Sequence, residues 1–148
     1  MFMKKLILEI LMGLSFNAAI FHTQIANIFS AEKPVTKTIS LSIARGAQYD
    51  ESAYNMSKAS VRVIIFKVKD NKQIVLWDKN YDTLLLKNYP AFSNALHNEV
   101  TVSNILDHKE KLYVTYIITY NTKGSVMQIE NGTTLLRGEK NSNVVINI

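Results

Sequence analysis

Beyond Lys37, apolar and polar residues alternate along most of the chain, and this period of two is typical of β-strands with one buried face. In the first such segment, Ile39, Leu41 and Ile43 fall on one face, with serines between them. Segments of this kind, rich in β-branched and aromatic residues, recur to the last residue. They lie at residues 39–43, 61–68, 73–78, 83–86, 99–103, 112–120, 125–129 and 144–148.

Turn residues separate these predicted strands. Asp70-Asn71-Lys72 lies between two of them and predicts a hairpin. The run 121–124, which ends in a glycine, predicts a second hairpin, and Asn131-Gly132 predicts a further turn. The strand at 61–68 begins apolar on both faces, which indicates a central position in its sheet.

Helical patterns are nearly absent. Residues 51–57 and 91–97 predict a turn or two of helix, but neither shows a sustained period of 3.6 residues. Seven or eight short strands spaced by turns favour an all-β fold, a single-domain antiparallel β-sandwich, with a small barrel as the second choice. We expect the polar stretch 48–60 to cross between the two sheets.

The start of the chain predicts an N-terminal signal segment. Two lysines precede an apolar stretch that runs to Ala31, which is how a secretory signal peptide is built. We assign residues 1–31 to this segment, with cleavage near Ala19, Ala26 or Ala31, and residues 32–148 to an exported β-sandwich domain. The alternative is an uncleaved membrane anchor, because the apolar stretch is long enough to span a bilayer.

Composition excludes several classes of protein. The 148 residues suffice for one domain with one core. The 17 Lys and Arg and 12 Asp and Glu are scattered, which argues against a nucleic-acid partner. The chain has no cysteine, so it has no disulfide, no thiol nucleophile and no residue to carry the lipid of a bacterial lipoprotein. Any membrane association must then come from a partner or from an uncleaved leader.

The chain has three histidines, and two of them lie near carboxylates. His97 stands two residues before Glu99, and Asp107 directly precedes His108. A metal site needs three or four converging ligands, and we interpret these pairs as solvated loop residues. We therefore expect no metal and no cofactor.

Other catalytic patterns are also missing. Serines are plentiful, but no Gly-x-Ser-x-Gly elbow and no phosphate-binding glycine loop is present. Asp78 and Asp82 could form a carboxylate pair for sugar chemistry, although we interpret them as the solvated face of a strand. The sequence predicts no catalytic residue and no enzyme.

Four aromatic residues fall in one irregular segment, at Trp77, Tyr81, Tyr89 and Phe92. In a small sandwich such residues more often close the open ends of the core, and this is the interpretation that we favour. Large aromatic residues can also anchor a protein partner. Trp77 and Tyr81 are the two candidate partner-binding residues.

The order of features over residues 39–148 resembles a small exported β-sandwich family that includes the YbaY lipoproteins and the YscW-type pilotins of type III secretion. An opening strand precedes an irregular segment, a central strand ends in an aspartate-containing turn, and a short strand leads to a second aspartate. The matching pieces are residues 38–43, 59–70, 98–107, 111–120, 134–137 and 143–148.

This resemblance implies a function. Pilotins of this family bind the C-terminal tail of an outer-membrane secretin subunit and help it to reach and assemble in that membrane. The family supplies no catalytic residues, and most members carry a lipid on an N-terminal cysteine that this chain lacks. The expected protein is a non-enzymatic periplasmic binding or chaperone module, at the inner face of the outer membrane. The alternatives are a small exported inhibitor or ligand binder, a fimbria-like surface subunit and an exported enzyme.

Overall fold

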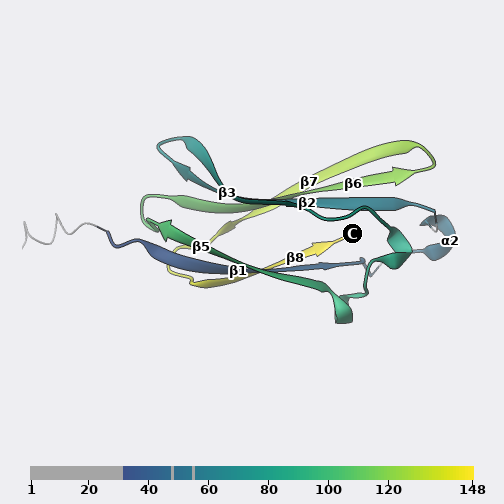
Figure 1. Ribbon diagram of the computed structural model, residues 1–148, viewed down its shortest axis with the longest axis horizontal. Coiled ribbons are helices and arrows are strands. Elements are labelled where there is room, and N and C mark those ends of the chain that lie inside the picture. Colours follow the sequence, from purple (N-terminus) through teal and green to yellow (C-terminus); the bar gives the residue numbers. More distant parts are fainter. Residues whose placement is uncertain (1–31, 48, 55) are drawn as a thin grey trace, which may run out of the picture. The chain divides into compact units, whose positions relative to one another are not determined.

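Two β-sheets face each other in the computed structural model, which describes residues 32–47, 49–54 and 56–148 (Figure 1). The predicted signal segment, residues 1–31, lies outside the described residues. The strands are β1 (Val35–Ala44), β2 (Lys58–Lys69), β3 (Lys72–Asn80), β4 (Leu84–Leu85), β5 (Leu96–Ile105), β6 (Lys111–Thr122), β7 (Ser125–Leu135) and β8 (Asn141–Asn147). The short helical elements are α2 (Glu51–Tyr54), η1 (Leu86–Asn88) and η2 (Phe92–Asn94).

The two sheets are unequal in width. One has three strands in the order β5-β1-β8. The other has the order β3-β2-β6-β7, and the short β4 pairs with the first residues of β2. The prediction of an all-β sandwich is confirmed, with two separate sheets rather than a closed barrel. β2 lies inside its sheet, as its apolar pattern predicted.

One pairing departs from an antiparallel sandwich. β8 runs parallel to β1, whereas every other pairing between the described strands is antiparallel. Parallel neighbours cannot be joined by a tight hairpin. β1 and β8 need no hairpin between them, because they are the first and last described strands and all the others lie between them along the chain.

The core lies between the inward faces of the two sheets. Ile39, Leu41 and Ile43 of β1 are fully buried, which confirms the face predicted from their alternation. Tyr89 closes one part of this core and donates a hydrogen bond from its hydroxyl to the carbonyl of Ala59, at 2.9 Å. Burial raises the pKa of Tyr89 to about 12, so the phenol stays neutral.

Both predicted hairpins form through two-residue turns. Asp70 and Asn71 have positive φ angles of 50° and 59° between β2 and β3. Lys123 and Gly124 have φ angles of 51° and 86° between β6 and β7. Two consecutive positive φ angles define the turn whose twist matches that of antiparallel strands.

The turn predicted at Asn131-Gly132 is wrong. Both residues lie inside β7, opposite Tyr116 and Thr115 of β6. A Cβ atom on Gly132 would lie 2.8 Å from the carbonyl oxygen of Val114, so glycine is needed here for close contact between the strands and not for a turn. β7 therefore continues to Leu135.

The connections agree more closely with the sequence. The stretch predicted to cross between the sheets does join β1 of one sheet to β2 of the other, and it contains the single turn of α2. The helical turn expected within residues 91–97 is the short η2, after which β5 begins. Among the described residues no helix combines the length and the apolar character needed to cross a bilayer.

Candidate binding cleft

The core-facing side of β7 is largely uncovered. Its register with β6 places Met127 opposite Tyr120, and Ile129 opposite the buried Ile118, so both side chains project toward the core side of the sheet. Leu135, on the same face, is 8% exposed, but Ile129 is 43% exposed and Met127 is 56% exposed. β7 is therefore covered at the end that leads to β8 and open at the other end.

The unequal widths of the two sheets explain this exposure. On the β3 side the sheets are linked directly, because Lys79 of β3 donates a hydrogen bond to Asn98 of β5 at 3.3 Å. On the other side β8 is the last strand of the narrower sheet. No described strand of that sheet lies beyond β8 to cover Met127 and Ile129.

The resulting cleft, here called the β7 cleft, has a volume of about 280 Å³. Its wall combines the end of the β6–β7 hairpin with α2, η1 and the residues around the ends of β1 and β8. The lining residues are Gly46, Tyr49, Tyr54, Leu86, Tyr120, Thr122, Met127, Ile129 and Ile148. None of these side chains carries a charge, so the β7 cleft suits an apolar occupant.

Local hydrogen bonds hold the wall of the β7 cleft in place. Asp50 caps α2, since its carboxylate accepts hydrogen bonds from the backbone N–H of Ser52 at 2.9 Å and from the Ser52 hydroxyl at 2.7 Å. The hydroxyl and backbone bonds from Ser52 lower the pKa of Asp50. Thr122 donates to the buried Ser57 at 2.9 Å, which ties the end of β6 to the segment that follows α2.

Tyr120 contributes a neutral polar group to the β7 cleft. Burial raises the pKa of its phenol, and the neighbouring Tyr116 adds to the rise. The phenol therefore stays protonated at neutral pH and can donate a hydrogen bond to an occupant.

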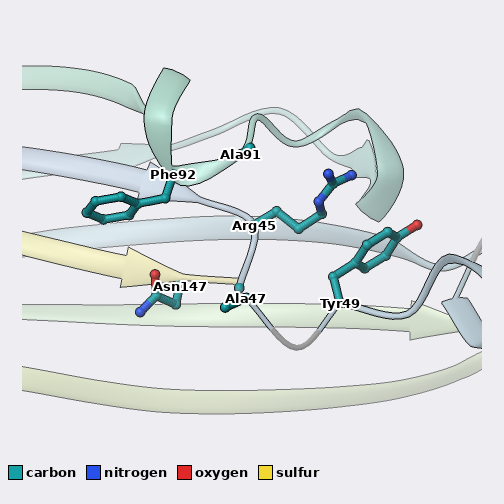
Figure 2. Close-up of a pocket in the computed structure, with 7 residues that line it drawn as sticks. Arg45, Ala47, Tyr49, Ala91, Phe92 and Asn147 are labelled. Atoms are coloured by element: carbon teal, nitrogen blue, oxygen red, sulfur yellow. The ribbon is translucent and has the colours of Figure 1, made fainter.

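A second cleft, here called the Arg45 cleft, lies at the same end of the sandwich and has a volume of about 640 Å³. Its lining residues are Arg45, Gly46, Ala47, Tyr49, Ala91, Phe92 and Asn147, most of them visible in Figure 2. The Arg45 guanidinium lies 4.6 Å from the centre of the Tyr49 ring and donates a hydrogen bond to the carbonyl of Lys87 at 3.1 Å. Among the described side chains that line the two clefts, only that of Arg45 is charged.

The two clefts adjoin each other, because Gly46 and Tyr49 line both. Gly46 donates its backbone N–H to the carbonyl of Ile148 at 2.7 Å, and a Cβ atom at Gly46 would lie 3.2 Å from the same oxygen. This close contact joins the end of β1 to Ile148, the residue after β8. The two clefts therefore form one continuous surface, which is apolar in the β7 cleft and carries the Arg45 guanidinium in the Arg45 cleft.

The structure places the two candidate partner-binding residues at the other edge of the five-stranded sheet. Trp77 lies in β3 and Tyr81 directly follows it, and both pack against the core. The ammonium of Lys79 lies 4.7 Å from the centre of the Tyr81 ring, and burial raises the pKa of the Tyr81 phenol. Neither residue lines the two clefts, and their role in partner binding stays a prediction.

The favoured interpretation of the four aromatic residues as core closures is correct for three of them. Tyr89 belongs to the buried core, and Trp77 and Tyr81 pack on it. It is wrong for Phe92, which is exposed and lines the Arg45 cleft instead. Phe92 lies in η2, none of whose residues is buried, directly before β5, the edge strand of the narrower sheet.

The histidines and carboxylates are spread over several elements. His97 lies in β5 and not in a loop as expected, with its Nδ1 3.0 Å from the Ser42 hydroxyl. Asp107 forms an ion pair with Lys37 at 2.7 Å. Within the described part of the chain, no group of three or more His, Asp or Glu side chains is placed to hold a metal ion.

Asp78 and Asp82 are exposed, as the sequence indicated. Both oxygens of Asp78 accept hydrogen bonds from the guanidinium of Arg62, at 3.0 and 2.6 Å. These hydrogen bonds and the positive charge of Arg62 lower the pKa of Asp78, which favours its ionised form.

Sequence reasoning missed the residues that form the β7 cleft. Residues 125–129 were predicted to form a strand, but no binding surface was predicted on it. The signal that could have found the cleft is the presence of two further apolar residues, Tyr54 and Met56, next to a turn. Both are exposed, and Tyr54 lines the cleft.

Comparison with family models, curated proteins and solved structures found no match to this chain. The resemblance to the YbaY and YscW-type family therefore rests on the sequence features given above.

Proposed function

We propose that this protein is a non-enzymatic binding module that takes an apolar segment of a partner protein into the β7 cleft. The observation that carries the proposal is the exposure of Met127 and Ile129 on the core-facing side of β7. Side chains on that side of a sandwich are normally covered by the opposite sheet. A partner that covers them completes a core that the described strands leave open.

The chemistry of the β7 cleft favours a peptide with apolar side chains over a small charged ligand. Complete burial of a Met or Ile side chain contributes about 1.5–3 kcal/mol. Covering the exposed parts of Met127 and Ile129 therefore supplies a few kcal/mol, enough for a specific contact when hydrogen bonds add to it.

Within this class, we propose a pilotin-like role in type III secretion. The partner would be the C-terminal tail of an outer-membrane secretin, met in the periplasm after export. The support for this step is the resemblance in the order of strands and turns. Because the chain has no cysteine, such a pilotin would act without a lipid of its own.

A capture experiment tests this proposal. The mature protein carries an affinity tag at its N-terminus, since β1 begins with Val35 and reaches the cleft only at its other end. It is mixed with detergent-solubilised envelope from its own source. We expect secretin in the eluate, and we expect its loss when the secretin lacks its C-terminal tail. Recovery of no secretin by the folded protein would refute the pilotin role.

Two variants of one strand show whether the β7 cleft is responsible. Met127→Ser combined with Ile129→Ser removes the apolar floor, and we expect at least about ten-fold weaker capture. Val126→Ser is the matched control, because Val126 is also an exposed apolar residue of β7 but points to the opposite face. It should leave capture unchanged, and both variants should fold because the altered side chains are exposed.

One observation favours the alternative of a small exported ligand binder. The Arg45 cleft has the volume of a small-molecule site and offers one cation beside an aromatic ring. This alternative becomes the better account if the capture experiment recovers no secretin.

A further inference from the structure

The outer edge of β8 has unpaired backbone groups. β8 pairs with β1 alone among the described strands. Lys140 accepts a hydrogen bond from the N–H of Thr38 at 2.8 Å, and Ile148 donates one to the carbonyl of Ala44 at 2.9 Å. Alternate residues of a strand bond to the same neighbour, so the even-numbered residues from 140 to 148 face β1. The odd-numbered residues direct their N–H and C=O groups to the free edge: Asn141, Asn143, Val145 and Asn147.

The space beside this edge lies over the uncovered part of β7. Neighbouring strands are about 4.8 Å apart and facing sheets about 10 Å apart. A strand added to β8 would therefore continue the narrower sheet over β7. Its inward side chains would meet Met127, Ile129, Asn131 and Thr133, the exposed residues of the core-facing side.

We propose that the partner segment binds as a β-strand on the free edge of β8, so that it becomes the fourth strand of the narrower sheet. This inference rests on the proposed function and specifies how the β7 cleft is filled. The seven residues of β8 set the length of the added strand. Hydrogen bonds to the edge supply affinity, and the β7 face selects the side chains.

The charges around the free edge of β8 indicate which side chains the added strand must have. β8 has no charged side chain, and none of the described side chains that line the β7 cleft is charged. The inward side chains of the occupant must then be uncharged, with apolar residues over Met127 and Ile129 and small polar residues over Asn131 and Thr133. Arg45 is the charge next to Asn147, so an acidic residue or a terminal carboxylate fits just beyond the apolar end.

The edge of β7 is the less suitable of the two neighbouring edges. Thr122 and Ser125 close a two-residue turn, so Val126 and every second residue after it direct their backbone away from β6. Gly132 belongs to this set, and its N–H already donates to the side chain of Asn131 at 2.8 Å. One donor of that edge is thus engaged, whereas the outward residues of β8 are open.

A second copy of the chain fits poorly at the free edge of β8. Symmetric pairing of two β8 strands would bring the two wider sheets together edge to edge. Because each β7 extends beyond β8, the two β7 strands would meet before the β8 edges could pair. The occupant is therefore an extended segment of another protein.

The test uses displayed peptides of random sequence, each longer than β8, selected on the purified mature protein. The most enriched peptides are synthesised and their affinities are measured against two proline variants. Val145→Pro removes an N–H that points to the free edge of β8 and places the proline ring where the added strand would bind. It removes no hydrogen bond to β1. Val126→Pro does the same to the edge of β7 and is the matched control.

We expect the enriched peptides to carry apolar residues at alternate positions and to end in an acidic residue. They should bind Val145→Pro at least about ten-fold more weakly than the wild type, and Val126→Pro equally well. In the wild-type complex, the amide hydrogens of Asn143, Val145 and Asn147 should exchange more slowly. This exchange measurement needs no variant, so it tests the added strand even if Val145→Pro does not fold.

Three outcomes with the purified protein overturn the inference. They are a failure to enrich any peptide, binding that leaves the exchange of these amide hydrogens unchanged, and self-association that Val145→Pro abolishes. Secretin capture that survives Val145→Pro but is lost with Met127→Ser and Ile129→Ser would refute the added strand. It would leave the proposed function standing.

Discussion

Two carboxylates, the half-buried Asp107 and the buried Glu110, fasten the loops at the end of the sandwich opposite the clefts. Asp107 pairs with the buried Lys37 of β1 at 2.7 Å and accepts a hydrogen bond from the N–H of Gly138. Glu110 pairs with Lys67 of β2 at 3.0 Å. The connection from β7 to β8 is thereby tied to β1 at this end. The β7 cleft opens at the other end of β7 and β8.

The ionised forms of both carboxylates are favoured in the folded protein. Burial alone would raise the pKa of Asp107, but the hydrogen bonds from Lys37 and Gly138 outweigh it and lower the pKa. Burial likewise opposes the ionisation of Glu110. The N–H of Leu106 and the ammonium of Lys67 outweigh it, so the pKa of Glu110 is also lowered.

Stability should therefore fall in acid. The unfolded chain, with its usual pKa values of 3.8 for Asp107 and 4.5 for Glu110, takes up protons at a higher pH than the folded protein does. The stabilisation is complete above these values, and it is lost as the pH falls below them and through the lower pKa values of the folded protein. Urea unfolding of the protein should show a loss on the order of 2 kcal/mol between about pH 5 and pH 3.

The control is the double variant Asp107→Asn with Glu110→Gln, which cannot lose these two charges on acidification. It should be less stable at neutral pH and show a flatter dependence on pH. If the wild type and this variant share one slope, the two carboxylates do not have the role assigned to them.

Sequence reasoning could not identify these pairs. Asp107 was interpreted as a solvated loop residue because its local surroundings are polar. Its partner Lys37 lies 70 residues away in the chain and is brought close only by the pairing of β1 with β5.

At the scale of elements, β7 is the strand whose length decides the shape of the cleft. It pairs with β6 from Ser125 to Leu135 without a shift in register. Gly132 allows this, because its backbone lies too close to Val114 to accept a side chain.

Gly132→Ala should therefore destabilise the protein by about 1–3 kcal/mol, as overpacking does in other tightly packed positions. Thermal and urea unfolding measure the effect. Thr134→Ala, in an exposed position of the same strand, is the control and should change stability little. Equal stability of the wild type and Gly132→Ala would show that β7 can move away from β6 at this point.

Most of the elements could be predicted from local patterns. Alternation identified the strands, and the residues at 70–72 and 121–124 identified both two-residue turns. The failure at Asn131-Gly132 has a physical cause, because this pair favours a turn locally while the long β6 offers it partners in a sheet. The parallel pairing of β8 depends on a contact between the two ends of the domain, which no local pattern contains.

At the scale of the whole molecule, the proposed function rests on a difference in width between the two sheets. Eight strands could be predicted, but their order could not, and the β7 cleft is a consequence of that order. The sequence pointed to Trp77 and Tyr81 because large aromatic side chains are conspicuous. The open apolar surface lies at the opposite edge of the same sheet, on Met127 and Ile129.

A methyl NMR titration of the protein with a peptide of the proposed partner, the secretin tail, distinguishes these two edges most directly. We predict that the methyl signals of Met127 and Ile129 shift, while those of Ile74 and Val75 stay in place. These last two are exposed residues of β3, on the strand that carries Trp77. Shifts at Ile74 and Val75, with none at Met127 and Ile129, would contradict the assignment of the β7 cleft as the binding site.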